Sequence, residues 1–213
     1  MIKFKPTYIA ALLAVSSTTL NAAELNIEIQ NLTHGIYFAP IAAVAHTPDA
    51  SLFEVGEIAS TELHVLANPA GGLLAPSTKA SGTLSTAAGN TVLSVVAMMV
   101  PTNDGFIGLD NWTIPTEAGT YTLFLNAYDA GTEANDEIRG DGTPGVPGMP
   151  VPPPLEVLVG TGGSGVAGAD TNATVHIHRG SIGDDSMTGG NSDVTNTVHR
   201  WLNPVAKVTV TVN

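Results

Sequence analysis

Residues 91–100 constrain the fold of this chain more than any other segment, because they are nearly continuous in apolar side chains. A run of this kind is typical of a central β-strand that is buried on both faces. Residues 24–30 and 121–127 instead alternate apolar and polar side chains, as half-buried strands do. The chain is therefore expected to be built from β-strands.

Further strands are predicted at residues 36–45, 80–85, 174–178 and 205–212. Residues 51–55 predict a helical turn, and residues 60–67 predict a short helix with Ser60 as its N-cap. The 23 Gly and 14 Pro cluster between these segments, and a β-ladder cannot run through the prolines of residues 135–154. The predicted fold class is all-β: an antiparallel β-sandwich of about eight strands, with one or two short helices and long Gly/Pro-rich loops.

The composition excludes several classes of function. Seven Lys and Arg stand against 19 Asp and Glu, for a net charge of −12, so the chain lacks the basic surface that nucleic acid requires. The absence of cysteine excludes thiol catalysis and cysteine-ligated zinc. We therefore expect no nucleic-acid partner.

The N-terminus has the pattern of a secretory signal. Lys3 and Lys5 precede a short apolar stretch, and cleavage is expected near Ala23. That stretch is too short to span a bilayer as a helix, and no later run reaches spanning length. Residues 1–23 are therefore predicted to be a cleaved signal peptide, residues 24–213 a single domain, and the protein secreted or periplasmic without a transmembrane segment.

Three carboxylates follow predicted strands in two neighbouring loops. Asp104 lies in the segment Val-Pro-Thr-Asn-Asp-Gly-Phe-Ile-Gly at residues 100–108, and Asp129 and Glu133 lie in Asp-Ala-Gly-Thr-Glu at residues 129–133. If these loops share one end of the sandwich, their oxygens suit a hard cation such as Ca²⁺. The alternative is that they are ordinary turn residues. Three nearby acids are expected to face solvent: Asp110, Asp136 and Glu137.

Four blocks together resemble the spondin N-terminal domain family. They are residues 46–53 (His-Thr-Pro-Asp-Ala-Ser-Leu-Phe), 91–108, 128–133 and 204–210, and they lie in the family order. The resemblance implies a spondin-like β-sandwich over residues 24–213, similar to the calcium-dependent membrane-binding domain of protein kinase C. It also implies calcium ligands at Asp104, Asp129 and Glu133. The chain departs from the animal pattern in having Glu133 for Asp, Gly105 for Trp and Asn103 for Pro.

Histidines offer a different kind of site. His176 and His178 share one face of a predicted strand, and His199 follows later. A His-x-His pair can bind zinc or copper, but packing or solvent exposure of these side chains is the favoured interpretation. No Gly-x-Ser-x-Gly elbow connects a strand to a helix, so the chain is not expected to be an enzyme.

Together these patterns predict a secreted calcium-binding spondin-like domain with an adhesion or extracellular binding role. Its expected partner is an extracellular protein or a glycan. Two alternatives stay open: an extracytoplasmic hydrolase or metalloenzyme with a histidine-centred site, and a purely structural envelope protein whose metal only stabilises the fold.

Overall fold

The computed structural model describes residues 22–60, 72–141, 143, 146–166 and 173–213. These residues form eight strands and one short 3-10 helix, η1. The elements are β1 (Glu24–Asn31), β2 (Tyr37–His46), β3 (Lys79–Ser85), β4 (Val92–Val100), β5 (Gly105–Thr113), β6 (Gly119–Asp129), η1 (Pro153–Leu155), β7 (His176–Ile177) and β8 (Ala206–Val212).

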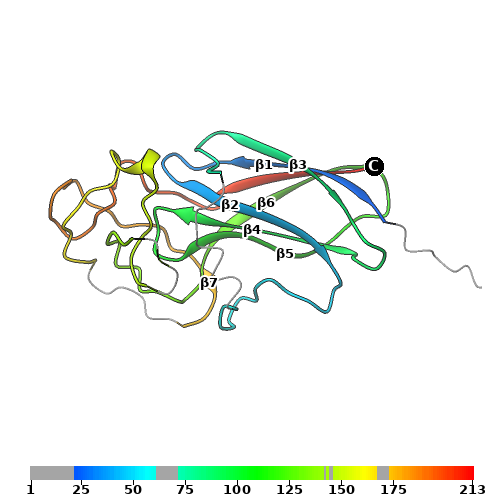
Figure 1. The fold of residues 1–213 in the computed structure, drawn as a ribbon, viewed down its shortest axis with the longest axis horizontal. Coiled ribbons are helices and arrows are strands. Elements are labelled where there is room, and N and C mark those ends of the chain that lie inside the picture. Colours follow the sequence, from blue (N-terminus) through cyan, green and yellow to red (C-terminus); the bar gives the residue numbers. More distant parts are fainter. Residues whose placement is uncertain (1–21, 61–71, 142, 144–145, 167–172) are drawn as a thin grey trace, which may run out of the picture.

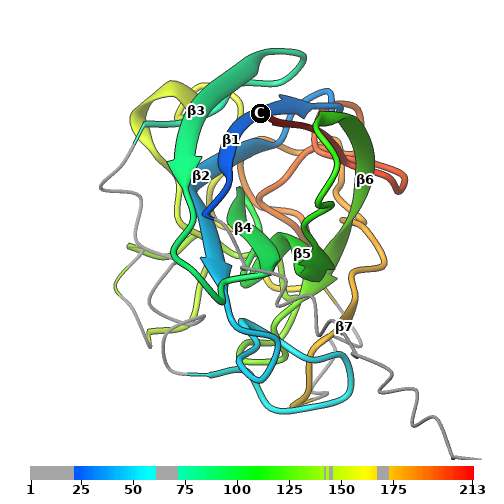
Figure 2. The same cartoon turned by 90° about the vertical axis from the view of Figure 1, so that its right-hand side faces the viewer.

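All the strand pairs are antiparallel, in the order β2-β4-β5-β6-β8-β1-β3, with β7 added beside β6. Strand β6 belongs to both halves of the sandwich. Its first part, from Gly119 to Leu125, pairs with β8, and its last part, from Asn126 to Asp129, pairs with β5. The sheet therefore curls into a barrel-like sandwich that is nearly closed (Figures 1 and 2). The predicted fold class is confirmed.

Strand β4 is apolar except for Ser94, and this composition matches its environment because all nine of its residues are buried. Leu93, Val95, Ala97 and Met99 point into the main core between the two halves of the sheet. Residues on its other face are covered by loops: Val96 packs with Phe53, and Met98 and Val100 pack with the segment around Leu155. The expected central strand, buried on both faces, is confirmed.

The elements of the fold differ from the sequence-based expectations at β5 and at residues 51–55, and β7 is shorter than the strand expected at residues 174–178. Strand β5 was not expected, because its glycines made residues 105–108 look like part of the preceding turn. The expected helical turn at residues 51–55 is irregular chain, because Asp110 accepts hydrogen bonds from Leu52 N (2.9 Å) and Ser51 Oγ (2.8 Å) and fixes it against β5. Most of the predicted helix at residues 60–67 lies outside the described residues.

Long connections gather at one end of the sandwich, opposite the C-terminus (Figure 1). We call this region the loop end: the turn at residues 101–104 with the described parts of residues 130–204. In the part of the chain that the structure describes, no helix is long and apolar enough to cross a membrane. An apolar groove also runs between the edge strands β2 and β3, lined by Ile27, Ile29, Ile41 and Leu84 among others.

Candidate metal site at the loop end

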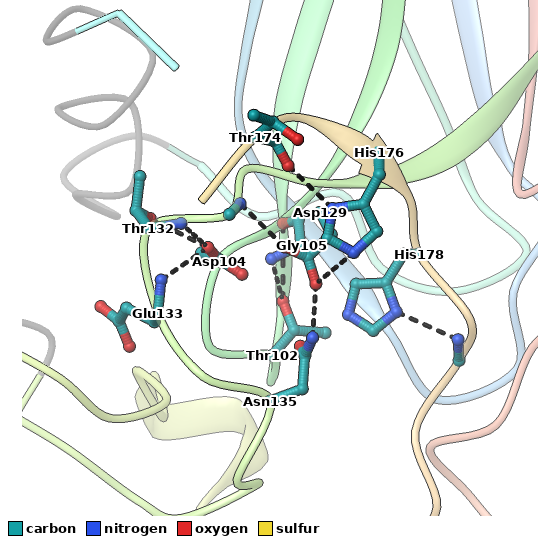
Figure 3. Close-up of polar contacts among 12 residues, drawn as sticks. Thr102, Asp104, Gly105, Asp129, Thr132, Glu133, Asn135, Thr174, His176 and His178 are labelled. Atoms are coloured by element: carbon teal, nitrogen blue, oxygen red, sulfur yellow. Dashed lines mark hydrogen bonds and ion pairs between the residues drawn. The ribbon is translucent and has the colours of Figure 1, made fainter. Parts of the chain in front are cut away.

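Two strand connections bring Asp104 and Asp129 together. Thr102 Oγ1 accepts a hydrogen bond from Gly105 N (2.9 Å), which closes the turn that carries Asp104. Gly105 then pairs with Asp129 across β5 and β6, and Ala130 N donates to the Asp104 carbonyl (3.3 Å). The two aspartates thus lie side by side, with Asp129 at the end of β6 and Asp104 directly before the start of β5 (Figure 3).

Asp104 has one oxygen fully engaged and one without a partner. Its Oδ2 accepts hydrogen bonds from Thr132 N (2.7 Å), Thr132 Oγ1 (2.9 Å) and Glu133 N (2.9 Å). Its Oδ1 is buried and has no hydrogen-bond partner, and the residue is only 8% exposed. Burial, followed by the negative charge of Asp129, raises the pKa of Asp104 to about 6.

Asp129 is more deeply buried, at 1% exposure. Its Oδ1 accepts a hydrogen bond from Gly131 N (2.8 Å), and its Oδ2 accepts one from Asn135 Nδ2. Gly131 adopts φ +69°, a left-handed conformation that suits glycine. His176 Nε2 lies 3.7 Å from Asp129 Oδ2. Asp129 therefore joins the turn after β6 to the β7 strand.

Glu133 contributes to this cluster through its backbone rather than its carboxylate. Its amide donates to Asp104, whereas its Oε2 accepts a hydrogen bond from Gly148 N (2.9 Å) in the long Gly/Pro-rich loop. Figure 3 shows the Glu133 carboxylate directed away from Asp104 and Asp129. The structure thus brings together two of the three predicted ligands and turns the third toward a neighbouring loop.

The two strand histidines face the same cluster. His176 and His178 point inward while Ile177 between them is exposed, so the expectation that they share a face is confirmed. His178 Nδ1 accepts a hydrogen bond from Gly180 N (3.0 Å), and its buried Nε2 has no partner. Burial lowers the pKa of His178 to about 4, against the opposing effect of Asp129. Its ring packs on Trp201, with ring centroids 5.0 Å apart.

Gly105 makes room for that imidazole. A Cβ at this position would lie 3.0 Å from His178 Cδ2 and 2.7 Å from Thr102 Oγ1. A larger residue would therefore displace both the turn and the His178 ring. The packing of this turn against His178 therefore requires glycine at position 105.

His199 lies in a different part of the loop end, where it accepts a hydrogen bond within the segment before β8. It is fully buried, and its Nδ1 accepts a hydrogen bond from Thr195 N (3.1 Å) while its Nε2 has no partner. Burial lowers the pKa of His199 to about 4. The imidazole is therefore neutral at physiological pH and holds the turn that precedes β8.

The expectation that Asp110, Asp136 and Glu137 face solvent is wrong. Glu137 is 6% exposed and accepts hydrogen bonds from Ile182 N, Gly183 N (2.8 Å) and Ser192 Oγ (2.6 Å). Asp136 and Asp110 are half-buried and accept hydrogen bonds as well. Apart from Ile138 N at Asp136 and Asn111 Nδ2 at Asp110, their partners come from distant segments, so the sequence near these acids gives little indication of their burial.

Two further carboxylates have the same role, and the sequence reasoning missed both. Asp193 is 2% exposed and accepts hydrogen bonds from Arg139 N (2.9 Å) and Gly163 N (2.8 Å). Asp184 accepts hydrogen bonds from the amides of Ser186, Asn191 and Ser192. The loop end is thus held by buried or half-buried acids that accept hydrogen bonds from backbone amides.

A comparison with protein-family models finds none that matches the chain, and a search of curated proteins also finds no match. Among the residues that the structure describes, no three histidine, aspartate or glutamate side chains are arranged so that they hold a metal ion as they stand. An ion at Asp104 and Asp129 would therefore need side-chain rotation, backbone carbonyls or water to complete its ligands.

Proposed function

We propose that this protein is an exported β-sandwich module that holds a calcium ion at its loop end and uses that end in adhesion or extracellular binding. Asp104 and Asp129 are the proposed ligands, and the proposed partner is an extracellular protein or a glycan. One observation carries the proposal: two buried, neighbouring carboxylates, one of which has an oxygen without a partner. The spondin-like motifs supply the expected ion and the adhesion role.

The physical argument rests on the cost of burying like charges. Two ionised carboxylates at close range repel each other, and burial removes the water that would stabilise them. The raised pKa of Asp104 reflects this cost. A divalent cation between Asp104 and Asp129 would offset it, and Ca²⁺ prefers carboxylate, carbonyl and water oxygens. The Glu133 carboxylate would have to turn away from its contact with Gly148 N to place Oε2 on the same ion.

The geometry favours a binding module over a histidine-centred enzyme. His178 is only 6% exposed and packs against Trp201, whereas a general acid or base must reach its substrate. Two grooves among the described residues lie along strands β2 and β3, and neither of these two is lined by His176 or His178.

Thermal unfolding with calcium, magnesium or chelator tests the proposed site. We expect calcium to raise the melting temperature of the wild type and of Asp141→Asn, a control that changes an exposed acid of the loop end. Asp104→Asn and Asp129→Asn should lose the response, because each removes a ligand charge. If millimolar calcium leaves the wild type unchanged, or stabilises all four proteins equally, the proposed site is wrong.

A binding assay separates a recognition module from a structural envelope protein. The protein would be applied to arrays of glycans and of extracellular proteins with calcium or with chelator. A recognition role predicts calcium-dependent retention that Asp104→Asn abolishes. Calcium-dependent stability without any calcium-dependent retention would favour the structural alternative.

A further inference from the structure

The sheet is one strand short of a closed antiparallel barrel. Its main path runs β2-β4-β5-β6-β8-β1-β3, and each strand is antiparallel to its neighbours. The direction therefore reverses an even number of times between β2 and β3, and these two edge strands run the same way. A single added strand that runs the opposite way would pair antiparallel with both edges.

The apolar groove between β2 and β3 occupies the position of that added strand. It has a volume of about 240 Å³ and is lined by side chains from three strands. Ile27 and Ile29 belong to the main core, and Ile41, Ala43 and Leu84 pack against it. Figure 2 shows β2 and β3 on the same side of the molecule. The groove therefore opens the main core to solvent along the gap between the two edges.

Small residues of β3 leave this space open. Ile27 pairs with Gly82, and Ile29 pairs with Ala80, so each small residue shares a face with the isoleucine beside it. A Cβ built at Gly82 would meet no atom within 4 Å. A larger side chain at position 82 would thus enter the groove and not the packed interior.

The chain itself shows how an extended segment binds at this gap. Leu74 forms an isolated antiparallel bridge with Phe38 of β2, in which Leu74 N donates to Phe38 O (2.9 Å) and Phe38 N donates to Leu74 O (3.1 Å). Residues 72–75 line a second groove, which shares Ile41 and Ala80 with the apolar groove. The apolar groove therefore continues from the point where Leu74 pairs. In the described part of the chain, no ladder extends this bridge along residues 41–45 or along the free edge of β3.

The two edges lack the features that usually prevent strand addition. Edge strands are commonly protected by charges, prolines or bulges. Strand β2 has Pro40 and a bulge between Ala39 and Ile41, but both lie next to the Leu74 bridge. Residues 41–45 and 80–84 contain no charged residue and no proline, although the chain has 19 Asp and Glu. These uncharged edges on both sides of an apolar groove fit an uncharged peptide strand.

We propose that the groove between β2 and β3 binds an extended segment of a partner polypeptide, which adds as a strand antiparallel to both edges and closes the barrel. A strand of about five residues matches residues 41–45. Its alternate side chains are aliphatic and enter the groove, while those between them are polar and face solvent. The inference goes beyond the proposed function, because neither Asp104 nor Asp129 lines this groove.

Selection of random heptapeptides displayed on phage tests the inference, with the folded protein as the target. The enriched sequences should carry aliphatic residues at alternate positions. Gly82→Val and Ser81→Val form a matched pair, because successive side chains of a strand point to opposite faces. Fluorescence anisotropy with a labelled enriched peptide should show that Gly82→Val weakens binding by at least about tenfold, whereas Ser81→Val binds as the wild type does. Thermal unfolding checks that both variants fold.

Hydrogen exchange of the wild type gives a second readout that needs no variant. The enriched peptide should slow exchange at amides within residues 41–45 and 80–84, because it accepts their free edge N–H groups. The inference is overturned if no peptide is enriched, if the enriched peptides lack the alternation, or if Gly82→Val binds them as the wild type does. Equal binding of a peptide with proline at its centre also overturns it, since backbone pairing would then be unnecessary. Wild-type dimers that Gly82→Val abolishes would identify a second copy as the occupant instead.

Discussion

The sandwich and the loop end of this molecule are held together by different forces. In the sandwich, backbone ladders satisfy the peptide groups, and aliphatic side chains such as Leu93 and Val208 fill the interior. At the loop end, Gly/Pro-rich chain forms few ladders, and carboxylates such as Glu137 and Asp193 accept the backbone amides instead. A region without regular structure can thus be specified by a few buried acids, because each buried N–H must find an acceptor.

This contrast between an aliphatic sandwich and a loop end held by acids also explains where we expect a cation to bind. Most of the loop-end acids are fully engaged, as the three donors to Glu137 show. Asp104 departs from this pattern, since one of its buried oxygens lacks a partner beside the charge of Asp129. An unsatisfied buried acceptor costs free energy. The proposed cation site therefore lies at the loop end, where a positive charge would offset this cost, and not in the aliphatic interior of the sandwich.

The largest expected effect comes from the sandwich. Leu93→Ala should lower the free energy of unfolding by about 3 kcal/mol, because Leu93 is fully buried in the main core. Urea unfolding followed by intrinsic fluorescence measures the change. A loss below about 1 kcal/mol would contradict the assignment of β4 as the central strand.

A smaller and more local effect is expected from Glu137→Ala at the loop end. The substitution removes the acceptor of two part-buried amides and one of the two acceptors of the Ser192 hydroxyl, which should cost roughly 2 kcal/mol. Hydrogen exchange should accelerate most at the amides of Ile182 and Gly183. Glu117→Ala, which changes an exposed acid, is the control. If hydrogen exchange accelerated equally throughout β4 and β8, the loop end and the sandwich would unfold together, and the proposed difference between them would be wrong.

The pH dependence of stability gives a further test of the loop end, because His199 and Asp104 both lie there. Because the pKa of His199 is lowered to about 4 from 6.5, its stabilising contribution is complete above pH 6.5 and is lost as the pH falls toward 4. Asp104 acts in the opposite direction, since its raised pKa gives stability at low pH that is lost as the pH rises through about 6.

His199→Asn isolates the histidine contribution, because Asn can still accept the Thr195 amide and Asp104 is unchanged. Between pH 6.5 and 4, the wild type should lose about 1–2 kcal/mol more stability than the variant. Urea unfolding at a series of pH values measures the difference. If the free energy of unfolding depended on pH in the same way in both proteins, the claim that His199 is buried as a neutral imidazole would be wrong.

The smallest effect is expected at the surface of the sandwich. The Lys79 Nζ–Glu28 Oε1 ion pair spans 2.7 Å, but its side chains are 51% and 41% exposed. Exposed pairs of this kind contribute less than about 1 kcal/mol. Lys79→Ala should therefore change the urea midpoint only slightly, and a large loss would show that the β1–β3 edge depends on charge.

The pattern of apolar and polar residues predicted most strands of the sandwich, because burial on one or both faces of a strand determines that pattern residue by residue. The continuous apolar run of β4 and the alternation of β1 and β8 follow directly from two-sided and one-sided burial. Strand β5 escaped prediction because Gly105 and Gly108 mimic a turn. Both glycines are required by close packing: a Cβ at Gly105 would meet Thr102, and one at Gly108 would meet Phe53 at 2.5 Å.

The candidate site was predictable only in part. Asp104 and Asp129 follow strands and were expected to meet, and they do so because Gly105 pairs with Asp129. The direction of the Glu133 carboxylate depends on Gly148, and the burial of Glu137 depends on amides 45 and 46 residues away. Such long-range partners leave no local pattern in the sequence.

A titration of the nitrogen-15-labelled protein with calcium tests most directly the central claim, which is that Asp104 and Asp129 hold a calcium ion. Amide resonances of Gly105, Gly131, Thr132 and Glu133 should shift with the added ion, because these residues adjoin or contact the two aspartates. Resonances of β1 and β8 should stay in place. The claim would be contradicted if no resonance shifts at millimolar ion, or if the shifts appear at exposed acids such as Asp141 and not at these four residues.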